Sequence, residues 1–171
     1  PTIFDFLGAS VFGLTVQDRR NLEAMMMAFD SEMGPMVGQQ ITLRPGAPAA
    51  DLARVNLMLS RAGAGDCDVI SKGVIQGNGA TVEEQRGTVY QPGSNSFLTD
   101  RGFTFPANII LGLPNSFNVE VTFTCVPVGS GQRMGVDRDL DTFLDQDEID
   151  AGTDPANPLS FPGGPTPTPG P

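Results

Sequence analysis

Residues 67–75 read CDVISKGVI and residues 119–126 read VEVTFTCV, and these two stretches decide the predicted fold. Both are rich in Val, Ile, Thr and Phe, the residue types that are enriched in strands. Shorter runs of the same character occupy residues 37–43, 87–91, 96–100 and 109–113. The turn-forming sequence Gln91-Pro92-Gly93-Ser94-Asn95 separates two of these runs and predicts a hairpin. We therefore expect a small antiparallel sheet.

Two helices are predicted upstream of most of these strands. Residues 16–33 follow Thr15, which forms a variant of the capping box with Asp18. The apolar side chains of this stretch recur at helical spacing; they are Leu22, Met25, Met26, Phe29 and Met33. A methionine stripe at this spacing usually faces a core, so we favour packing over a role in haem ligation. Residues 49–61 predict the second helix, and two helices packed on one side of a sheet make an α+β fold.

The length of 171 residues suits one compact core with tails. The composition divides the chain into an apolar N-terminal arm over 1–14, an α+β core domain over 15–136, an acidic segment over 137–155 and a Pro-rich tail over 156–171. The prolines of the tail favour an extended polyproline conformation. Two interpretations of the tail remain open: a disordered spacer, or a segment that docks on a neighbour. No apolar run reaches the length of a membrane span.

The net charge of −10 is concentrated near the C-terminus. Residues 137–154 hold eight of the twenty acids against one base, whereas the rest of the chain has twelve acids and nine bases. Such a cluster repels itself unless solvent or a cation neutralises it. No comparable cluster of Lys or Arg is available to bind phosphates, so we expect no nucleic-acid partner.

The acidic segment matches a twelve-residue calcium loop that runs from Asp137 to Glu148. The side chains at positions 1, 3, 5, 9 and 12 and the backbone carbonyl at position 7 are the expected ligands. They correspond to Asp137, Asp139, Asp141, Asp145, Glu148 and Phe143. The cofactor that this pattern predicts is Ca²⁺, and the alternative is a solvated acidic linker. The full fold prediction is two helices packed on a small antiparallel sheet, followed by a calcium loop and an extended Pro-rich tail.

One position of the loop departs from the pattern, because Thr142 stands where a glycine with positive φ is usual. Keeping that conformation with Thr should cost roughly 1 to 2 kcal/mol. Leu144, at the eighth position, is expected to point into the domain and to tether the loop. The glycines of residues 129–133 argue against an entering helix, so we expect a loop that staples the C-terminal segment rather than a sensor that opens a groove.

Cys67 and Cys125 permit one internal pairing, and an exported acidic protein favours a disulfide between them. The alternative is two buried thiols. The chain contains no His, which excludes the common triads, Cys-His nucleophiles and zinc sites. Ser71 and Lys72 are neighbours in a predicted strand and should face opposite sides, which defeats a Ser-Lys pair. We therefore expect no enzyme.

Three resemblances support an exported protein. Asp137-Arg138-Asp139-Leu140-Asp141, with Asp145, Glu148 and Gly152-Thr153-Asp154-Pro155, resembles the calcium loops of thrombospondin type 3 and dockerin-like repeats. The run Val121-Thr122-Phe123-Thr124-Cys125-Val126-Pro127, which leads into this loop, resembles the C-terminal region of large exported bacterial proteins that carry cytochrome-type or propeller domains upstream. Residues 1–33 are similar to the closing helix of di-haem cytochrome c peroxidase-like domains.

Together these features predict a non-catalytic, calcium-binding structural module that is secreted, on the cell surface or in the periplasm. Its partners would be further copies, in a homo-oligomer or a self-assembling fibre, or a neighbouring domain of a longer chain. The alternative is an accessory C-terminal domain of a periplasmic di-haem peroxidase-like or electron-transfer protein. That alternative requires haem-attachment motifs upstream, because a chain without His cannot bind such a haem itself.

Overall fold

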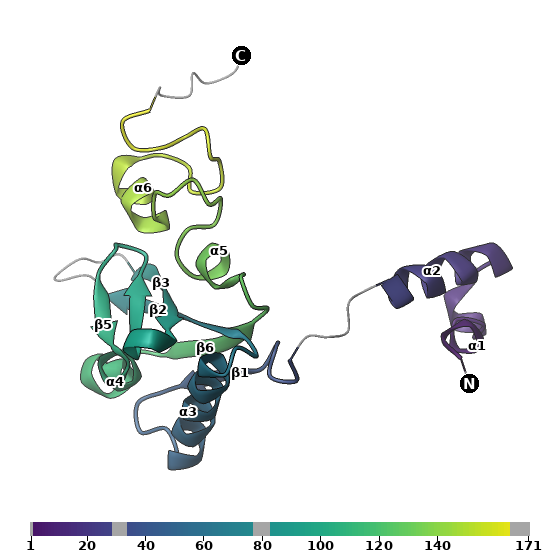
Figure 1. Ribbon diagram of the computed structural model, residues 1–171, viewed down its shortest axis with the longest axis horizontal. Coiled ribbons are helices and arrows are strands. Elements are labelled where there is room, and N and C mark those ends of the chain that lie inside the picture. Colours follow the sequence, from purple (N-terminus) through teal and green to yellow (C-terminus); the bar gives the residue numbers. More distant parts are fainter. Residues whose placement is uncertain (1, 29–33, 77–82, 165–171) are drawn as a thin grey trace. The chain divides into compact units, whose positions relative to one another are not determined.

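The computed structural model describes residues 2–28, 34–76 and 83–164. The chain divides into two compact units, which comprise Pro1–Met33 and Gly34–Pro171. We call them unit 1 and unit 2 and describe each by itself (Figure 1). Among the described residues, no helix is both long enough and apolar enough to cross a membrane.

Unit 1 is built from α1 (Ile3–Phe6), the 3-10 helix η1 (Ser10–Phe12) and α2 (Val16–Ala28). The predicted capping box is confirmed: the Asp18 N–H donates to Thr15 Oγ1 at 3.2 Å, and the Thr15 N–H donates to Asp18 Oδ2 at 3.1 Å. The first residues fold back on α2, because the Phe4 N–H donates to Glu23 and the Arg19 guanidinium lies 4.9 Å from the centre of the Phe4 ring.

The prediction that the methionine stripe of α2 faces a core is wrong for Met25 and Met26 within unit 1. Their exposed fractions are 52% and 46%. The physical reason is size, since a segment of this length has too little surface to enclose a core. Phe29 and Met33, which belonged to the same predicted helix, lie outside the described residues.

Unit 2 contains the predicted antiparallel sheet. Its six strands, in chain order, are β1 (Gln40–Leu43), β2 (Asp68–Gln76), β3 (Glu83–Gln91), β4 (Ser96–Thr99), β5 (Thr104–Pro106) and β6 (Val121–Val126). Their spatial order is β1-β6-β2-β3-β4-β5, so the two stretches that decided the prediction lie side by side at the centre. The predicted hairpin is also present, with the 3-10 helix η2 (Pro92–Ser94) ending at Asn95 in the left-handed region, at φ 48°.

Two helices of unit 2, α3 (Ala49–Gly63) and α4 (Ala107–Phe117), pack on one face of this sheet. α3 confirms the second predicted helix, whereas α4 replaces a predicted strand at 109–113. An apolar run of this kind fits a helix or a strand, and the structure selects the helix because Ala107, Ile110 and Pro114 recur at helical spacing and are buried. The extended residue Pro106 precedes the helix and ends the strand β5.

The core lies between α3, α4 and one face of the sheet. Phe97 and Phe123 are fully buried at its centre, and their ring centroids are 6.0 Å apart. The opposite face carries α5 (Gly131–Gly135), a short helix that corrects the expectation of no helix before the acidic segment. Glycine is required at position 87, because a Cβ there would collide with the Gly135 carbonyl of α5. This close approach brings the acidic segment onto the sheet.

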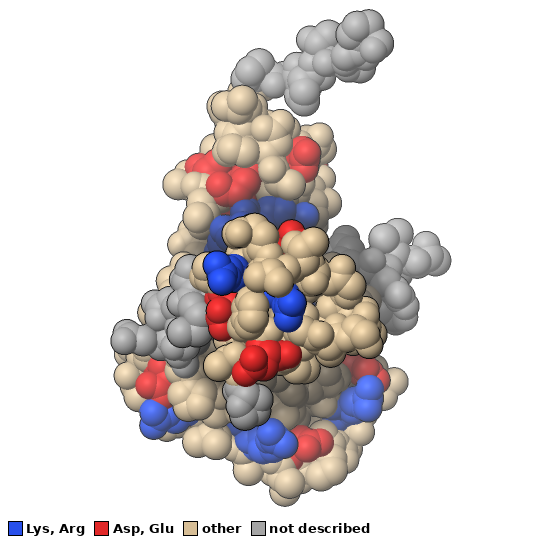
Figure 2. Space-filling model, turned by 90° about the vertical axis from the view of Figure 1, so that its right-hand side faces the viewer, with Lys and Arg blue, Asp and Glu red and all other residues tan. Residues whose placement is uncertain are grey.

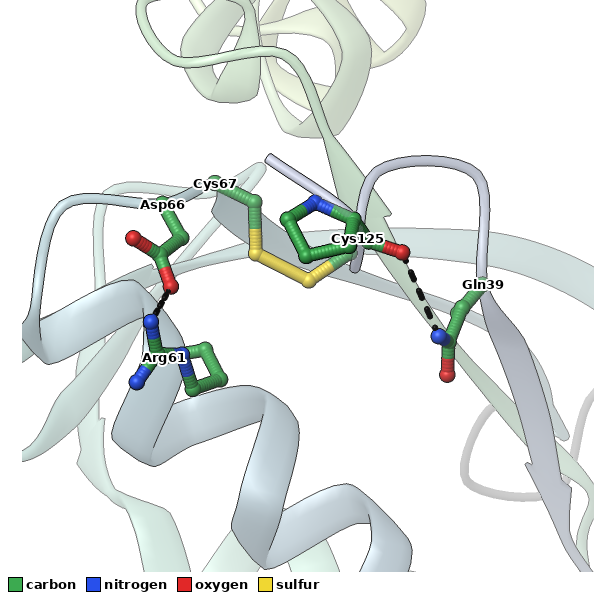
Figure 3. Close-up of a disulfide and its surroundings, with 6 residues drawn as sticks. Gln39, Arg61, Asp66, Cys67 and Cys125 are labelled. Carbon is green, nitrogen blue, oxygen red and sulfur yellow. Dashed lines mark hydrogen bonds and ion pairs between the residues drawn. A yellow bond between two sulfur atoms is a disulfide. The ribbon is translucent and has the colours of Figure 1, made fainter. Parts of the chain in front are cut away.

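The predicted disulfide joins Cys67, just before β2, to Cys125 in the neighbouring β6. Their Cα atoms are 5.6 Å apart, and both side chains are buried. Figure 3 shows the disulfide beside an ion pair between Arg61, in the last turn of α3, and Asp66. The disulfide links the start of β2 to β6, and the adjacent ion pair links the same place to the end of α3.

We expect the disulfide to contribute about 4 kcal/mol to the free energy of unfolding, because it closes a loop with a sequence separation of 58 residues. Denaturant unfolding should show this loss in the double variant Cys67→Ala/Cys125→Ala and in the reduced wild type. Reductant should leave the double variant unchanged. Equal midpoints for the oxidised and reduced wild type would contradict the prediction.

Candidate metal centre

Three carboxylates converge in the segment that follows α5. One oxygen each from Asp137, Asp139 and Asp141 lies within 4.8 Å of the other two. The local fold causes this convergence, because the Leu140 N–H donates to Asp137 Oδ1 at 2.7 Å and the Phe143 N–H donates to Asp141 Oδ1 at 2.8 Å. These short bonds curl the backbone around the three acids. The structure thus brings together the first three predicted ligands.

The curl requires unusual backbone angles. Leu140 and Thr142 adopt φ values of 62° and 86°, in the left-handed region that favours glycine. Thr142 therefore adopts the positive φ that was expected for the sixth position of the predicted loop, and its Cβ makes that conformation costly by roughly 1 to 2 kcal/mol. The shape of the loop is preserved at the expense of local strain.

Glu148 lies beside this triad, on α6 (Asp145–Ala151). Its side chain is fully buried, and neither carboxylate oxygen has a hydrogen-bond partner among the described residues. Burial, followed by the negative charges of Asp139, Asp141 and the other loop aspartates, raises the pKa of Glu148 to about 7. The pKa of Asp139 is also raised, first by burial and then by its acidic neighbours, against a hydrogen bond from the Asp141 N–H that lowers it. A cation among these oxygens would remove the repulsion that these pKa shifts report.

Asp145 is placed differently from the triad. Its Oδ1 accepts a hydrogen bond from the Arg138 N–H at 2.9 Å, and its Oδ2 accepts from the Arg138 guanidinium at 3.1 Å. Both carboxylate oxygens of Asp145 are thus bonded to Arg138, which is compatible with the water-mediated contact that is common at the ninth position of such loops. The ring of Phe143 stacks on Phe161 with centroids 5.6 Å apart, which fixes the seventh residue of the loop against the following segment.

The loop is held on the sheet by residues that the sequence did not single out. The buried Asp100, directly after β4, accepts a hydrogen bond from the Gly87 N–H at 2.7 Å through its side chain and one from the Gln146 N–H at 3.2 Å through its carbonyl. Lys72 of β2 donates to the Gly135 carbonyl at 2.9 Å. Burial lowers the pKa of Lys72 and raises that of Asp100. In the sequence, the only hint of the contact between β2 and α5 is that Lys72 is the single lysine of the chain.

Further contacts fix α6 and the end of the loop. Arg101 forms an ion pair with Asp150 at 2.7 Å. Leu144 is half-buried and its Cδ1 lies 3.6 Å from the Cβ position of Gly102, as expected for a residue that tethers the loop. Figure 2 shows acidic side chains gathered at the level of α6, with basic side chains directly below them. The acidic segment is therefore a packed part of unit 2.

Other candidate groups take structural roles. The Ser71 hydroxyl lies 2.7 Å from that of Thr88, whereas Lys72 bonds to α5, so the two neighbours face opposite sides as predicted. Asp66 pairs with Arg61. Asp68 accepts hydrogen bonds from the Gly129 and Gly131 N–H groups, each at 2.8 Å, and so anchors the start of α5.

Comparisons with protein-family models, curated proteins and solved structures find no match to this chain. The assignment of a function therefore depends on the geometry of the loop and on its chemistry.

We expect the strain at Thr142 to appear in a comparison of two substitutions. Thr142→Gly removes the Cβ that opposes the positive φ, whereas Thr142→Ala keeps it and serves as the matched control. The glycine variant should be more stable than the alanine variant by about 1 kcal/mol in the free energy of unfolding. A more stable alanine variant, as is usual at negative φ, would show that the loop adopts another conformation.

The stability of the metal-free protein should depend on pH through Glu148. The pKa of Glu148 is about 7 in the folded protein and 4.5 ordinarily, so the folded state binds this proton more tightly than the unfolded chain does. The stability that the proton provides is complete below the ordinary pKa of 4.5 and is lost as the pH rises through about 7. In chelator, the wild type should therefore lose stability between about pH 5 and pH 8. Glu148→Gln should weaken this dependence, and Glu120→Gln, at an exposed site, should not. A wild-type stability that increases with pH over this range would contradict the prediction.

Proposed function

We propose that the chain is a secreted, non-catalytic structural module in which a calcium ion joins residues 137–148 to the sheet of unit 2. The observation that carries this proposal is Glu148, a fully buried carboxylate whose two oxygens lack hydrogen-bond partners among the described residues and which lies beside the Asp137, Asp139 and Asp141 triad. A buried charge of this kind requires a compensating partner. A divalent cation supplies one.

The chemistry of the donors supports calcium over other ions. Three aspartates, both oxygens of Glu148 and the Phe143 carbonyl would provide six oxygens, and Asp145 would add another through water. Calcium takes six to eight oxygens at about 2.3 to 2.6 Å. Magnesium demands a smaller and stricter octahedron, and zinc favours Cys and His, which the loop lacks.

The surroundings of the loop support a structural role for the ion. The helices that flank the loop have five and seven residues, and the loop is held against the sheet through Asp100 and Lys72. A sensor needs a pair of longer helices that can open and expose a groove. We infer that the ion instead fastens the C-terminal segment to the sheet domain.

An extracellular location agrees with two features. Disulfides persist mainly in oxidising compartments, and Cys67 and Cys125 form one. The strain at Thr142 weakens the site, which suits the affinities of about 10⁻⁴ to 10⁻³ M at which extracellular modules bind calcium. We further propose that the module assembles with copies of itself, since both units leave large apolar side chains exposed, among them Phe6, Val11, Phe103 and Phe117.

Calcium should raise the melting temperature of the wild type relative to chelator. At a calcium concentration one hundred times the dissociation constant, the stabilisation should be about 2.7 kcal/mol. Asp139→Ala and Glu148→Gln should abolish this shift. Asp147→Asn is the control, because it removes the same charge as Glu148→Gln from an exposed residue of α6. An unchanged melting temperature for the wild type at about 100 mM calcium, a hundredfold excess over the weakest affinity of about 10⁻³ M, would refute the proposal.

A further inference from the structure

A second feature of unit 2 is an apolar groove between the β4–β5 hairpin and α4, with a volume of 330 Å³. Its apolar lining comprises Phe103, Phe105, Ile109, Ile110, Leu113 and Phe117. Phe103 and Phe117 are 62% and 64% exposed, and Phe105 and Ile109 are also more than one-third exposed. Three phenylalanine rings thus line an open groove that the described part of unit 2 leaves uncovered, and exposed apolar patches of this kind mark interaction sites.

The charges at one end of the groove are already balanced within the protein. Arg101 is paired with Asp150 of α6, and the Asp100 carboxylate accepts the Gly87 N–H and lies near Arg86, whose charge lowers its pKa against the effect of burial. A charged ligand would have to displace these partners. The groove therefore suits an uncharged occupant that contacts aromatic rings.

We propose that this groove binds the Pro-rich tail of a second copy of the chain. Residues 165–171 read Pro-Thr-Pro-Thr-Pro-Gly-Pro and carry no charged side chain. Proline-rich segments favour the polyproline conformation, and aromatic-lined grooves bind such segments through the proline rings. A preformed helix of this type loses little conformational entropy on binding. Seven residues in this conformation span about 22 Å.

The position of the tail favours a contact between copies. The last described residues follow the loop, where Phe161 is held by the stacked ring of Phe143. Figure 1 shows these last described residues, drawn in yellow, beyond α6 and at the end of unit 2 away from α4. The tail of one copy and the groove of the next are different surfaces, so the contact between them is head-to-tail. Each copy in such a contact still offers a free tail or a free groove, to which a further copy can bind. This inference rests on the self-assembly in the proposed function and does not require the calcium site.

The test uses two full-length variants and their mixture. Phe117→Asp places a charge in the groove at an exposed position, and Pro165→Ala/Pro167→Ala/Pro169→Ala alters the tail. The wild type should gain mass with concentration in light scattering, and each variant alone should remain monomeric. A mixture of the two should form dimers and stop, because it contains one intact groove for each intact tail. Val128→Asp is the control at a 62% exposed apolar residue outside the groove, and it should assemble as the wild type does.

A second measurement does not depend on variants. An excess of synthetic peptide with the sequence of residues 161–171 should dissociate wild-type assemblies, and the same peptide with alanine for each proline should not. Assembly that survives both the peptide and Phe117→Asp would overturn the proposal. A monomer at every concentration would also overturn it, including the case in which the tail occupies the groove of its own copy. Each experiment is run with calcium and with chelator, so that loss of calcium-dependent stability is separated from loss of the contact between groove and tail.

Discussion

The mutual repulsion of the carboxylates in residues 137–148 is the constraint on which the C-terminal half of unit 2 depends. Oxygens within 4.8 Å of one another carry an unfavourable energy of about 3 to 4 kcal/mol per ionised pair near a protein surface. The nearby cations do not offset it fully, since Arg138 is bonded to Asp145 and Lys72 to the Gly135 carbonyl. The repulsion can be lowered further by a proton on Glu148 or by a cation bound among the carboxylate oxygens. The proton and the cation compete for the same atoms, so proton and metal binding are linked.

The rest of the architecture holds these charges in place. The backbone tolerates positive φ at Leu140 and Thr142 because the aspartate side chains accept N–H groups along the curl. The sheet supports the loop through Asp100 and Lys72, and β2, which carries Lys72, follows directly after the disulfide at Cys67. A single central strand therefore connects the covalent crosslink to the surface on which the loop rests. Stability at one site is expected to affect the other through this strand.

The sequence predicted the features that depend on neighbouring residues. The capping box of Thr15, the hairpin at Asn95, the strands around Phe123 and the convergence of the three aspartates all follow from local patterns. The strand predicted at 109–113 is a helix because a short apolar run does not distinguish the two, and only packing of Ile110 decides.

The contacts around the loop were not predictable for a different reason. Arg138 lies within the predicted loop and pairs with one of the predicted ligands, Asp145, but no sequence pattern indicates which carboxylate an arginine will select. Asp100 is separated from the loop by more than thirty residues and acts mainly through backbone groups, so its residue type carries no signal. Long-range contacts of this kind are set by the fold, and they decide which of the predicted ligands face a common centre.

The distribution of charge gives the proposed assembly a direction. The acidic side chains gather at the level of α6 (Figure 2). The apolar groove lies between the β4–β5 hairpin and α4, and the charges at one end of the groove are paired within the protein. Two copies that met through their acidic ends would repel each other, and two grooves that met would leave both tails unbound. The arrangement that satisfies both constraints is tail to groove, with the acidic end of each copy directed to the next. If the loop binds calcium as proposed, the ion would also reduce the negative charge of this end.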